Sequence, residues 1–555
     1  MDEEAARIRI IQITDVYTLD NFPYLKTLIE EKKAEMDALG GKTISMLTGD
    51  FLAPYLLSSF DKGKGMVQIL NKTPIQYVIW GNHEHDLEHE DVMKREKEYQ
   101  GIWINSNMKS HESFDGSKCQ VDREVIEIIS PDGSNKRKLG MLGVLSNVAS
   151  LYKPEAFGGA TIEDPWECMK EYNAKLKNDD GCDMVLPLCH LYEFQDEKTC
   201  NEFDFPVVMS GHDHHKVDRM INGTRLLKPG MDAHYAIVMD LVWESVNSYS
   251  TPSINVATIP VKDFAPDKEL IKEVEKAYSI LDPLLKTDLS IIPQKYSPLS
   301  SKGARECRST MATYLCSQIK QALNMGQKKT DNCDCVLIKG GNIRGERDYD
   351  KYNFTLEALK TEMLEEEGVH IYCIKGKALK GCLKETFYGP NPGWIQYDDG
   401  VDVDSEGNIV AIGGFPLIEN MIYRVGSFQD LHIDYGGQPT LADYFKENPQ
   451  DLPDHDAGIG CHVLLLKLFS HGIWKKLWAL LDADGDGEVT SEELKALDID
   501  GDGHISKAEL KAAIANNLGL SSCMSTLVDY VLEVAGDVDK DGKLSVDEIN
   551  KPFIN

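Results

Sequence analysis

Short apolar runs, separated by stretches with helical spacing, set the architecture of the first half of this chain. Over residues 7–210 they read as strands at 7–14, 42–47, 75–80, 138–145, 183–188 and 205–210. Residues 24–39 carry leucine, isoleucine and methionine, including Leu39, at helical spacing, which predicts a helix between the first two strands. The alternation of strands and helices predicts an α/β layered domain.

Most of these strands end in a residue that can bind a metal ion. The side chains at these ends are Asp15, Asp50, Asn82, His190, His212 and His214. In an open α/β sheet, ligands bind just beyond the carboxyl ends of the strands, so we expect these side chains to converge on one crevice. A lone histidine is more often structural. Five segments that are polar at the same strand position predict a metal site, since carboxylates neutralise cations and neutral imidazole suits zinc, manganese and iron.

The order of these motifs resembles the calcineurin-like metallophosphoesterases. The chain has Asp15, then "GD" at 49–50, "GNHE" at 81–84, His190, and "GHDH" at 211–214. The run "GNHEHD" at 81–86 is similar to the 5′-nucleotidase branch of that family. The resemblance implies a layered β-sandwich flanked by helices, and a metal-dependent phosphoric ester hydrolase that takes part in nucleotide breakdown.

The resemblance also assigns a role to each residue. Asp50 would bridge two divalent metals (Zn, Mn, Fe or Co), Asp15 and His214 would bind one of them, and Asn82, His190 and His212 would bind the other. His83 would be the catalytic acid, and Asp86 would orient it. Two such cations about 3.5–4 Å apart clamp the attacking and leaving oxygens of an in-line displacement, and they make hydroxide available near neutral pH.

One position departs from the family pattern. The first strand of the family usually ends in Asp-x-His, whereas this chain has Asp15-Val16-Tyr17. Tyr17 is therefore included among the metal residues with three alternatives open. It ligates as phenolate, it lies near the metal without ligating, or it leaves that metal one ligand short.

Residues 304–455 resemble the C-terminal substrate domain of 5′-nucleotidases, and the fold class expected there is α+β. "LIKGGNIRG" at 337–345 is similar to the Asn-Gly-Gly-x-Ile-Arg loop of that domain. The resemblance implies that Arg344, Gly340, Gly341 and Asn342 bind substrate, because a planar guanidinium suits bidentate contact with phosphate. The family's Asn is Lys339 here, so the sequence supports phosphate-ester hydrolysis better than it supports a nucleoside leaving group.

Three acidic loops near the C-terminus fit the EF-hand pattern D-x-D-x-D-G-x5-E. Side chains at positions 1, 3, 5 and 12 and the backbone carbonyl at position 7 would bind Ca²⁺, with glycine at position 6 allowing the sharp turn. The residues are Asp482, Asp484, Asp486, Glu488 and Glu493 in loop one; Asp498, Asp500, Asp502, His504 and Glu509 in loop two; and Asp537, Asp539, Asp541, Lys543 and Glu548 in loop three. Loops two and three have the spacing of an ordinary pair. Loops one and two start only 16 residues apart, so we expect loop one to lack a normal partner.

The domain boundaries expected from these patterns are 1–262 for the metallophosphoesterase domain, 263–303 for a helical linker, 304–455 for the substrate domain and 460–555 for an all-α EF-hand module. The net charge of −32 argues against nucleic acid as a partner and suits metal cations. The first residues lack an apolar secretory core and no stretch resembles a membrane span, so we expect a cytoplasmic protein.

The expected function is release of phosphate from nucleotides or related phosphate esters by metal-activated hydroxide attack, with calcium bound by the EF hands. The expected partners are a small-molecule phosphate ester and an intramolecular or protein partner for the EF-hand module. A different class of function stays open. Tyr17 and Lys339 would then mark a catalytically impaired phosphoesterase that acts as a calcium-dependent interaction protein.

Overall fold

The computed structural model describes residues 3–114, 120–152, 155–247, 252–285, 288–325, 328–350, 352–363, 368–384, 394–433, 439–453, 458–518, 520, 525–537 and 541–550. The chain divides into two units, Met1–Ser279 and Ile280–Asn555, which are described separately.

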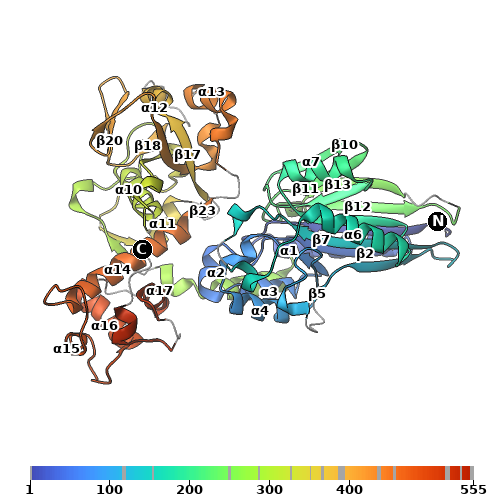
Figure 1. Ribbon diagram of the computed structural model, residues 1–555, viewed down its shortest axis with the longest axis horizontal. Helices are drawn as coiled ribbons and strands as arrows, with labels where there is room; N and C mark the ends of the chain where they lie inside the picture. The colour runs from blue at the N-terminus through green and yellow to red at the C-terminus, as the bar shows by residue number, and fades with distance from the viewer. Residues whose placement is uncertain are drawn as a thin grey trace. The chain divides into compact units, whose positions relative to one another are not determined.

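The first unit contains two large β-sheets (Figure 1). In spatial order, the seven-stranded sheet holds β13 (Ser253–Pro260), β12 (Tyr235–Trp243), β1 (Ala6–Ile13), β2 (Lys42–Thr48), β3 (Tyr77–Ile79), β4 (Ile102–Ile104) and β5 (Gln120–Val121). The six-stranded sheet holds β10 (Lys216–Ile221), β11 (Thr224–Pro229), β9 (Val207–Ser210), β8 (Met184–His190), β7 (Lys136–Leu145) and β6 (Glu124–Ile129). Each of the six predicted strands is present, within a few residues of its expected limits.

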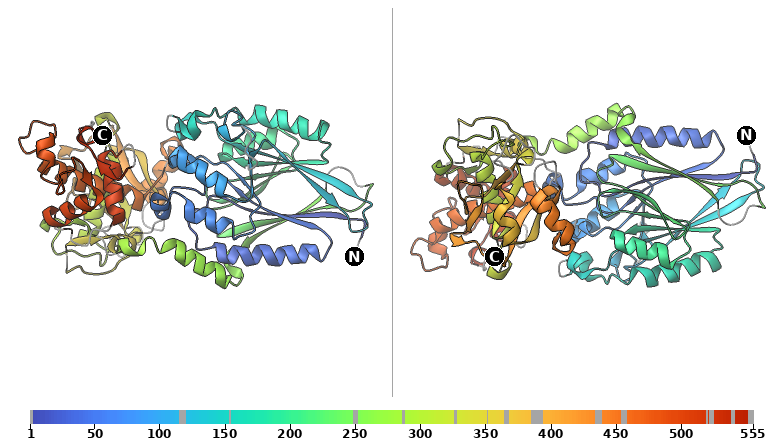
Figure 2. Two further views of the ribbon diagram at one scale, coloured as in Figure 1. Left: turned by 90° about the horizontal axis from the view of Figure 1, so that it is seen from below. Right: turned by 90° about the horizontal axis from the view of Figure 1, so that it is seen from above.

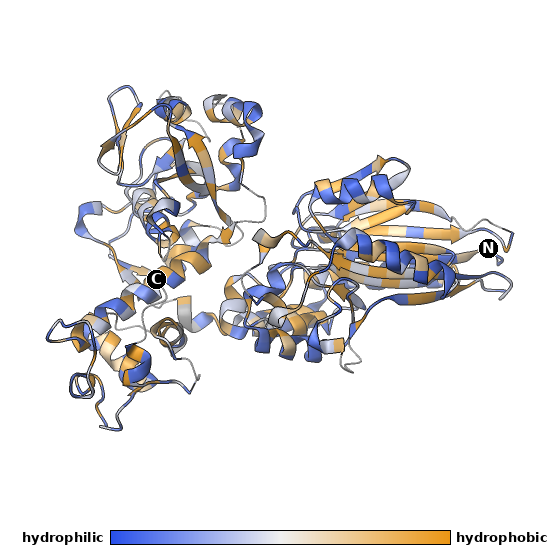
Figure 3. Cartoon of the chain, in the orientation of Figure 1, coloured by the Kyte–Doolittle hydropathy of each residue, from blue (hydrophilic) through white to orange (hydrophobic). Residues whose placement is uncertain are grey.

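The two sheets of this unit pack face to face, with helices on the outside (Figure 2). One buried cluster joins Ile10, Met46 and Ile104 of the first sheet to Met141 and Leu186 of the second. The helices are α1 (Phe22–Asp37), α2 (Leu56–Asp61), α3 (Lys64–Leu70), α4 (His89–Glu98), α5 (Ala156–Gly159), α6 (Pro165–Asn178), α7 (Glu193–Glu202) and α8 (Lys268–Tyr278). Helix α1 packs on β1 and β2, and α6 packs on β7 and β8, so each sheet is covered on its outer face. Figure 3 shows the corresponding apolar strands between more polar helices.

Helix α1 shows how local sequence sets the limits of an element. It begins at Phe22 with Pro23 in its first turn, where the fixed φ of proline suits a helix. It ends at Asp37, because the chain turns at Gly40, whose φ is +69°. The prediction that Leu39 belongs to the buried face of this helix was wrong, since Leu39 lies beyond the helix and is 40% exposed.

Strand direction in this unit places several chain segments at one edge. Strands β1, β2, β3, β4 and β5 run parallel, as do β7, β8, β9 and β11 in the other sheet. The carboxyl ends of parallel neighbours meet at the same edge of a sheet. The polar residues that follow β1, β2, β3, β8 and β9 are therefore brought together by the pairing of the strands.

The second unit has a five-stranded sheet, a three-stranded sheet and two short strand pairs. They are β18 (Ile395–Tyr397), β15 (Cys335–Lys339), β22 (Ile422–Phe428), β17 (Gly368–Lys375) and β23 (Ile459–Gly460); β19 (Val401–Val403), β20 (Ile409–Ile412) and β21 (Phe415–Pro416); β14 (Asp288–Ile291) with β16 (Asn353–Thr355); and β24 (Ile505–Ser506) with β25 (Lys543–Leu544). The helices are α9 (Asp282–Leu285), α10 (Thr310–Leu323), α11 (Leu356–Glu362), α12 (Gly376–Cys382), α13 (Pro439–Glu447), α14 (Cys461–Leu481), α15 (Ser491–Leu494), α16 (Lys507–Leu518), α17 (Ser525–Ala535) and α18 (Val546–Ile549).

Helix α14 joins the mixed α/β part of this unit to the acidic loops. Near its start, His462 Nε2 lies 3.0 Å from the Met363 carbonyl oxygen, and Phe469 packs edge-on against Phe354. Its end leads directly into Asp482, and Trp474 and Leu477 are buried. The helix also packs against α10, α16 and α17. One continuous helix therefore belongs to both parts.

Candidate metal centre

Four of the predicted metal ligands have a backbone conformation that non-glycine residues rarely adopt. Asp15, Asp50, His212 and His214 have φ values of +51°, +55°, +84° and +56°. Each residue in this conformation destabilises the folded state by about 1–3 kcal/mol, so the conformation persists only where the surrounding structure holds it. Such residues cluster at active sites and ligand-binding segments. All four lie just beyond the ends of strands β1, β2 and β9.

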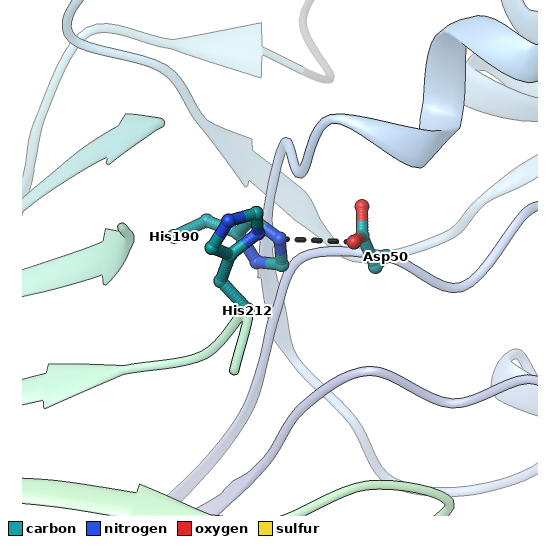
Figure 4. Close-up of side chains that lie close together, drawn as sticks. All are labelled: Asp50, His190 and His212. Atoms are coloured by element: carbon teal, nitrogen blue, oxygen red, sulfur yellow. Dashed lines mark hydrogen bonds and ion pairs between the residues drawn. The ribbon is translucent and has the colours of Figure 1, made fainter. Parts of the chain in front are cut away.

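Three of the predicted metal ligands form a buried group at the strand ends (Figure 4). Asp50, His190 and His212 each offer a ligand atom, these atoms lie within 4.8 Å of one another, and all three residues are buried. His190 Nδ1 is 2.8 Å from the Thr48 carbonyl oxygen, which makes Nδ1 the donor of the ring. His190 Nε2, 3.0 Å from Asp50 Oδ2, is then the nitrogen available to a metal.

Asp15 and His214 lie beside this group. Asp15 Oδ1 is 3.6 Å from His214 Nε2 and 3.9 Å from His190 Nε2. The Asp15 carboxylate also accepts hydrogen bonds from the backbone N–H of His212 at 3.0–3.2 Å. The Tyr17 hydroxyl is 3.3 Å from Asp50 Oδ2 and 3.2 Å from His214 Nε2. The structure therefore places Tyr17 at the centre, and its ligation of a metal stays a prediction.

Glycines let these segments approach one another. A Cβ on Gly81 would lie 2.1 Å from Asp50 Oδ1, and one on Gly49 would lie 2.4 Å from His190 Nδ1. A Cβ on Gly211 would lie 2.0 Å from Thr14 Oγ1. Real Cβ atoms do not approach other atoms this closely, so each position requires glycine for the carboxylates and imidazoles to meet.

The electrostatics of the centre favour a cation. Burial raises the pKa of Asp15, and His190 opposes that shift. Burial opposes a charged imidazole at His190, but the Asp50 and Asp15 carboxylates outweigh it and raise the pKa of His190. Positive charge is therefore stabilised between the two carboxylates. Bound divalent cations would supply it, and the mixed carboxylate and imidazole donor set suits borderline transition metals.

The segment after β3 places the predicted catalytic pair at the more exposed side of the centre. His83 Nδ1 is 2.7 Å from Asp86 Oδ2, and the His83 side chain is 13% exposed. The His83 backbone N–H donates to Asp50 Oδ1 at 2.8 Å. Asn82 is buried and lies between Gly81 and His83, which both contact Asp50. All predicted residues of the centre are thus brought to one edge, and their individual roles stay predictions.

Sequence reasoning missed Glu84, a buried carboxylate that holds the Asp50 turn. Its two oxygens accept hydrogen bonds from the backbone N–H groups of Asp50, Phe51, Leu52 and Gly81 at 2.7–3.1 Å. Burial raises the pKa of Glu84 to about 7, and Asp50 adds to the rise. The sequence signal was its position inside "GNHE".

Sequence reasoning also missed Lys228, a buried lysine on β11. Its Nζ donates to the carbonyl oxygens of Leu191 and Gly211 at 2.8 Å and pairs with Asp196 and Asp213. These carbonyls adjoin His190 and His212, so Lys228 ties the two histidine segments together. The available signal was a lysine within the otherwise apolar run "LLKP".

The predicted substrate residues lie in the second unit, just after β15. Gly340 and Asn342 bound a 3₁₀ turn, and a Cβ on Gly340 would lie 2.0 Å from the Ala304 carbonyl oxygen. Gly341 lies within the same turn, and the Arg344 side chain is exposed. Lys339, which replaces the family's Asn, is buried and donates to the carbonyl oxygens of Asp430 and Ile433. Contact between a substrate and the predicted residues Gly340, Gly341, Asn342 and Arg344 stays a prediction.

The acidic loops fold around their carboxylates. Ligand atoms of Asp482, Asp484 and Glu493 lie within 4.8 Å of one another in loop one, as do those of Asp498, Asp500 and Glu509 in loop two. In each loop the carboxylate at position 5 accepts the backbone N–H of position 7: Asp486 from Glu488, Asp502 from His504, and Asp541 from Lys543. Loops two and three pair through β24 and β25, as their spacing predicts. Asp539 of loop three lies outside the described residues.

Comparison with known proteins places the first unit in a family. Residues 8–216 match the family model of calcineurin-like phosphoesterases. This part of the chain is a calcineurin-like phosphoesterase domain. Residues 479–497, 494–514 and 535–554 match the EF-hand model. The predicted fusion of a phosphoesterase domain with EF hands is therefore confirmed.

Relatives of the phosphoesterase domain include bacterial proteins named 5′-nucleotidase. The one from Vibrio vulnificus is 26% identical over 201 residues, which cover 34% of this chain and 35% of the relative. The one from Vibrio cholerae is 27% identical over 171 residues, 31% of this chain and 30% of the relative. The match thus spans about a third of the length of these relatives.

A solved structure extends the likeness of fold beyond that domain. The NAD nucleotidase of Haemophilus influenzae superimposes with a TM-score of 0.56 at 14% identity, covering 82% of this chain and 95% of that protein. The predicted fold class, an α/β phosphoesterase followed by a mixed domain and EF hands, is confirmed. Among the helices that the structure describes, none has the length and apolar character needed to cross a membrane.

Proposed function

We propose that the chain hydrolyses phosphate esters at a dinuclear metal centre in its phosphoesterase domain. One observation carries the proposal: Asp50, His190 and His212 bring ligand atoms from three strand ends within 4.8 Å of one another in a buried position. Asp15 and His214 adjoin this group, so the donors suffice for two cations such as zinc, manganese, iron or cobalt. When bound, such ions supply Lewis acidity and lower the pKa of the attacking water.

His83 is the general acid in this proposal. The Asp86 carboxylate, 2.7 Å from Nδ1, fixes the ring orientation and stabilises an imidazolium, so Nε2 carries the transferable proton. The backbone N–H of His83 holds the ring next to Asp50. Proton donation from Nε2 to the leaving-group oxygen or to a phosphoryl oxygen neutralises the charge that develops there.

Nucleotides are the substrate class that this proposal favours, because the relatives from Vibrio are named 5′-nucleotidase. Arg344 is exposed and carries a guanidinium that suits bidentate contact with phosphate. If it binds substrate phosphate, Arg344→Ala raises KM while leaving metal affinity unchanged.

Phosphate release from a panel of substrates tests the reaction. The panel contains nucleoside monophosphates, a nucleotide sugar, a cyclic nucleotide and an aryl phosphate, each with Mn²⁺, Zn²⁺ or Mg²⁺. His83→Ala is expected to lose most turnover while still binding metal. His89→Ala is the matched control, because His89 belongs to the same domain and pairs with Glu112 at the surface.

We further propose that the EF hands bind calcium and stabilise the second unit. Helix α14 enters loop one and also packs against α10, so order in the loop constrains both parts. A ligand that binds only the folded form raises the melting temperature. Unchanged melting from micromolar to millimolar Ca²⁺ would refute the stabilisation of the second unit by calcium.

No phosphate release with any metal, together with intact calcium binding, would instead favour the impaired phosphoesterase that acts as a calcium-dependent interaction protein.

A further inference from the structure

Loop one differs from the other two acidic loops in how its eighth position is held. In loops two and three this position is Ile505 and Leu544, which pair as neighbouring strands. In loop one it is Val489, whose side chain is buried at 1% exposure. Among the strands that the structure describes, none pairs with Val489. An unpaired backbone at this position would leave the loop without the support that the other two loops give each other.

The side chain of Asn550 takes the place of a partner strand. The Val489 backbone N–H donates to Asn550 Oδ1 at 2.6 Å, and Asn550 Nδ2 donates to the Val489 carbonyl oxygen at 2.6 Å. A carboxamide carries one acceptor and a donor side by side, as a strand residue does with its own C=O and N–H. The two hydrogen bonds reproduce the two-way contact of a β-bridge with one side chain from 61 residues away.

Asn550 is itself fixed by the third loop. It follows α18, and its backbone N–H donates to the Val546 carbonyl oxygen at 3.1 Å. Glu548, the twelfth residue of loop three, lies two positions before it in the chain. Ile549, between them, is buried at 2% exposure. The position of the amide therefore depends on the helix that leaves loop three.

We propose that Asn550 is a positioning residue for the calcium site of loop one, and that it couples this site to loop three. The proposal rests on the calcium binding proposed above. The peptide group between Glu488 and Val489 transmits the hydrogen bond of Asn550 to the calcium site of loop one. A trans peptide points its N–H and C=O in opposite directions. Holding the Val489 N–H fixes the direction of the Glu488 carbonyl, the expected position-7 ligand.

Coupling follows from the geometry of loop three. Calcium there requires Glu548 as its closing ligand, which sets the orientation of α18. Because Asn550 is held at the end of α18, occupancy of loop three places the amide where Val489 needs it. Two neutral hydrogen bonds correspond to roughly 10- to 30-fold in an equilibrium constant. Loop one is therefore expected to bind calcium more tightly when loop three is occupied.

Calorimetric calcium titration of the full chain tests the proposal. Glu493→Gln identifies the binding step of loop one as the step that it removes. Asn550→Leu, which removes both hydrogen bonds, is expected to weaken that step by roughly tenfold or more and to leave the loop-two step within a factor of two or three. Asn517→Leu is the matched control, because Asn517 is an exposed asparagine of the same module. An unchanged loop-one step in Asn550→Leu would overturn the proposal.

Two further measurements separate positioning from general destabilisation. Glu548→Gln, which disables loop three, is expected to weaken the loop-one step in the native background and to have little effect once Asn550 is leucine. Hydrogen exchange at the Val489 amide reports the contact independently of affinity, with protection lost in Asn550→Leu and kept in the control. Equal weakening of every step, with Val489 still protected, would refute the proposal. The absence of any calcium step in the unmodified chain would overturn both this inference and the calcium binding on which it rests.

Discussion

Protonation of His462 is expected to loosen helix α14 below neutral pH. This histidine is buried at 1% exposure near the start of the helix, and its Nε2–H donates to the Met363 carbonyl oxygen. Burial lowers the pKa of His462 to about 4, from an ordinary value of 6.5. The unfolded segment therefore binds more protons than the folded one at pH values between 4 and 6.5. The contribution of neutral His462 to the stability of α14 is therefore complete above the ordinary pKa of 6.5 and is lost as the pH falls towards 4.

The magnitude follows from the two pKa values. The difference between a pKa of 6.5 and one of about 4 corresponds to roughly 3 kcal/mol over the full titration. Between pH 7 and pH 5 the expected loss is about 2 kcal/mol, or roughly twentyfold in the opening equilibrium of α14. His462→Gln keeps a donor for the Met363 carbonyl oxygen but cannot titrate, so its opening equilibrium lacks this pH dependence.

Hydrogen exchange of the α14 amides in the full chain measures this opening without assuming two-state unfolding of the protein. The ratio of exchange rates between the native chain and His462→Gln cancels the intrinsic effect of pH. The ratio is expected to change by roughly twentyfold between pH 7 and pH 5. His504→Gln, at a histidine of the same unit whose side chain is 43% exposed, provides the control. Parallel pH profiles for the native chain and His462→Gln would refute the reasoning.

Three other substitutions probe the first unit. In Gly211→Ala the new Cβ would lie 2.7 Å from the Thr48 carbonyl oxygen. Because overpacking costs about 1–3 kcal/mol, calorimetry should show Mn²⁺ binding weakened by roughly tenfold. The control Gly472→Ala, at an open helical position, should leave Mn²⁺ binding unchanged. Glu84→Gln turns an NH₂ group towards two backbone N–H donors and should weaken Mn²⁺ binding in the same titration, and native affinity would refute its role in holding the turn. Asp164→Ala removes the side-chain cap of α6 and should lower the free energy of unfolding of this unit by about 1 kcal/mol in urea titrations, with Mn²⁺ affinity kept.

Much of the candidate site follows from local sequence. Asp15, Asp50 and His190 were predicted to meet because each follows or ends an apolar strand, and parallel neighbours align their carboxyl ends. The acidic loops were predicted in the same way, since alternate carboxylates and a glycine at position 6 already specify a cation-binding turn. The mistake at Leu39 shows the limit of spacing alone, because apolar periodicity continues past the residue where the chain turns.

The supports of these sites were decided only by tertiary structure. Lys228 ties the segments of His190 and His212 together, and Asn550 supports Val489. No local sequence pattern around either residue identifies its hydrogen-bond partner. A hydrogen bond needs its donor and acceptor within about 3 Å, and long-range closure of the chain sets that distance. Sequence by itself determined the candidate ligands, because strand ends and loop spacing are local properties. The fold decided what holds them, because buried polar groups must find partners wherever the packed chain brings them.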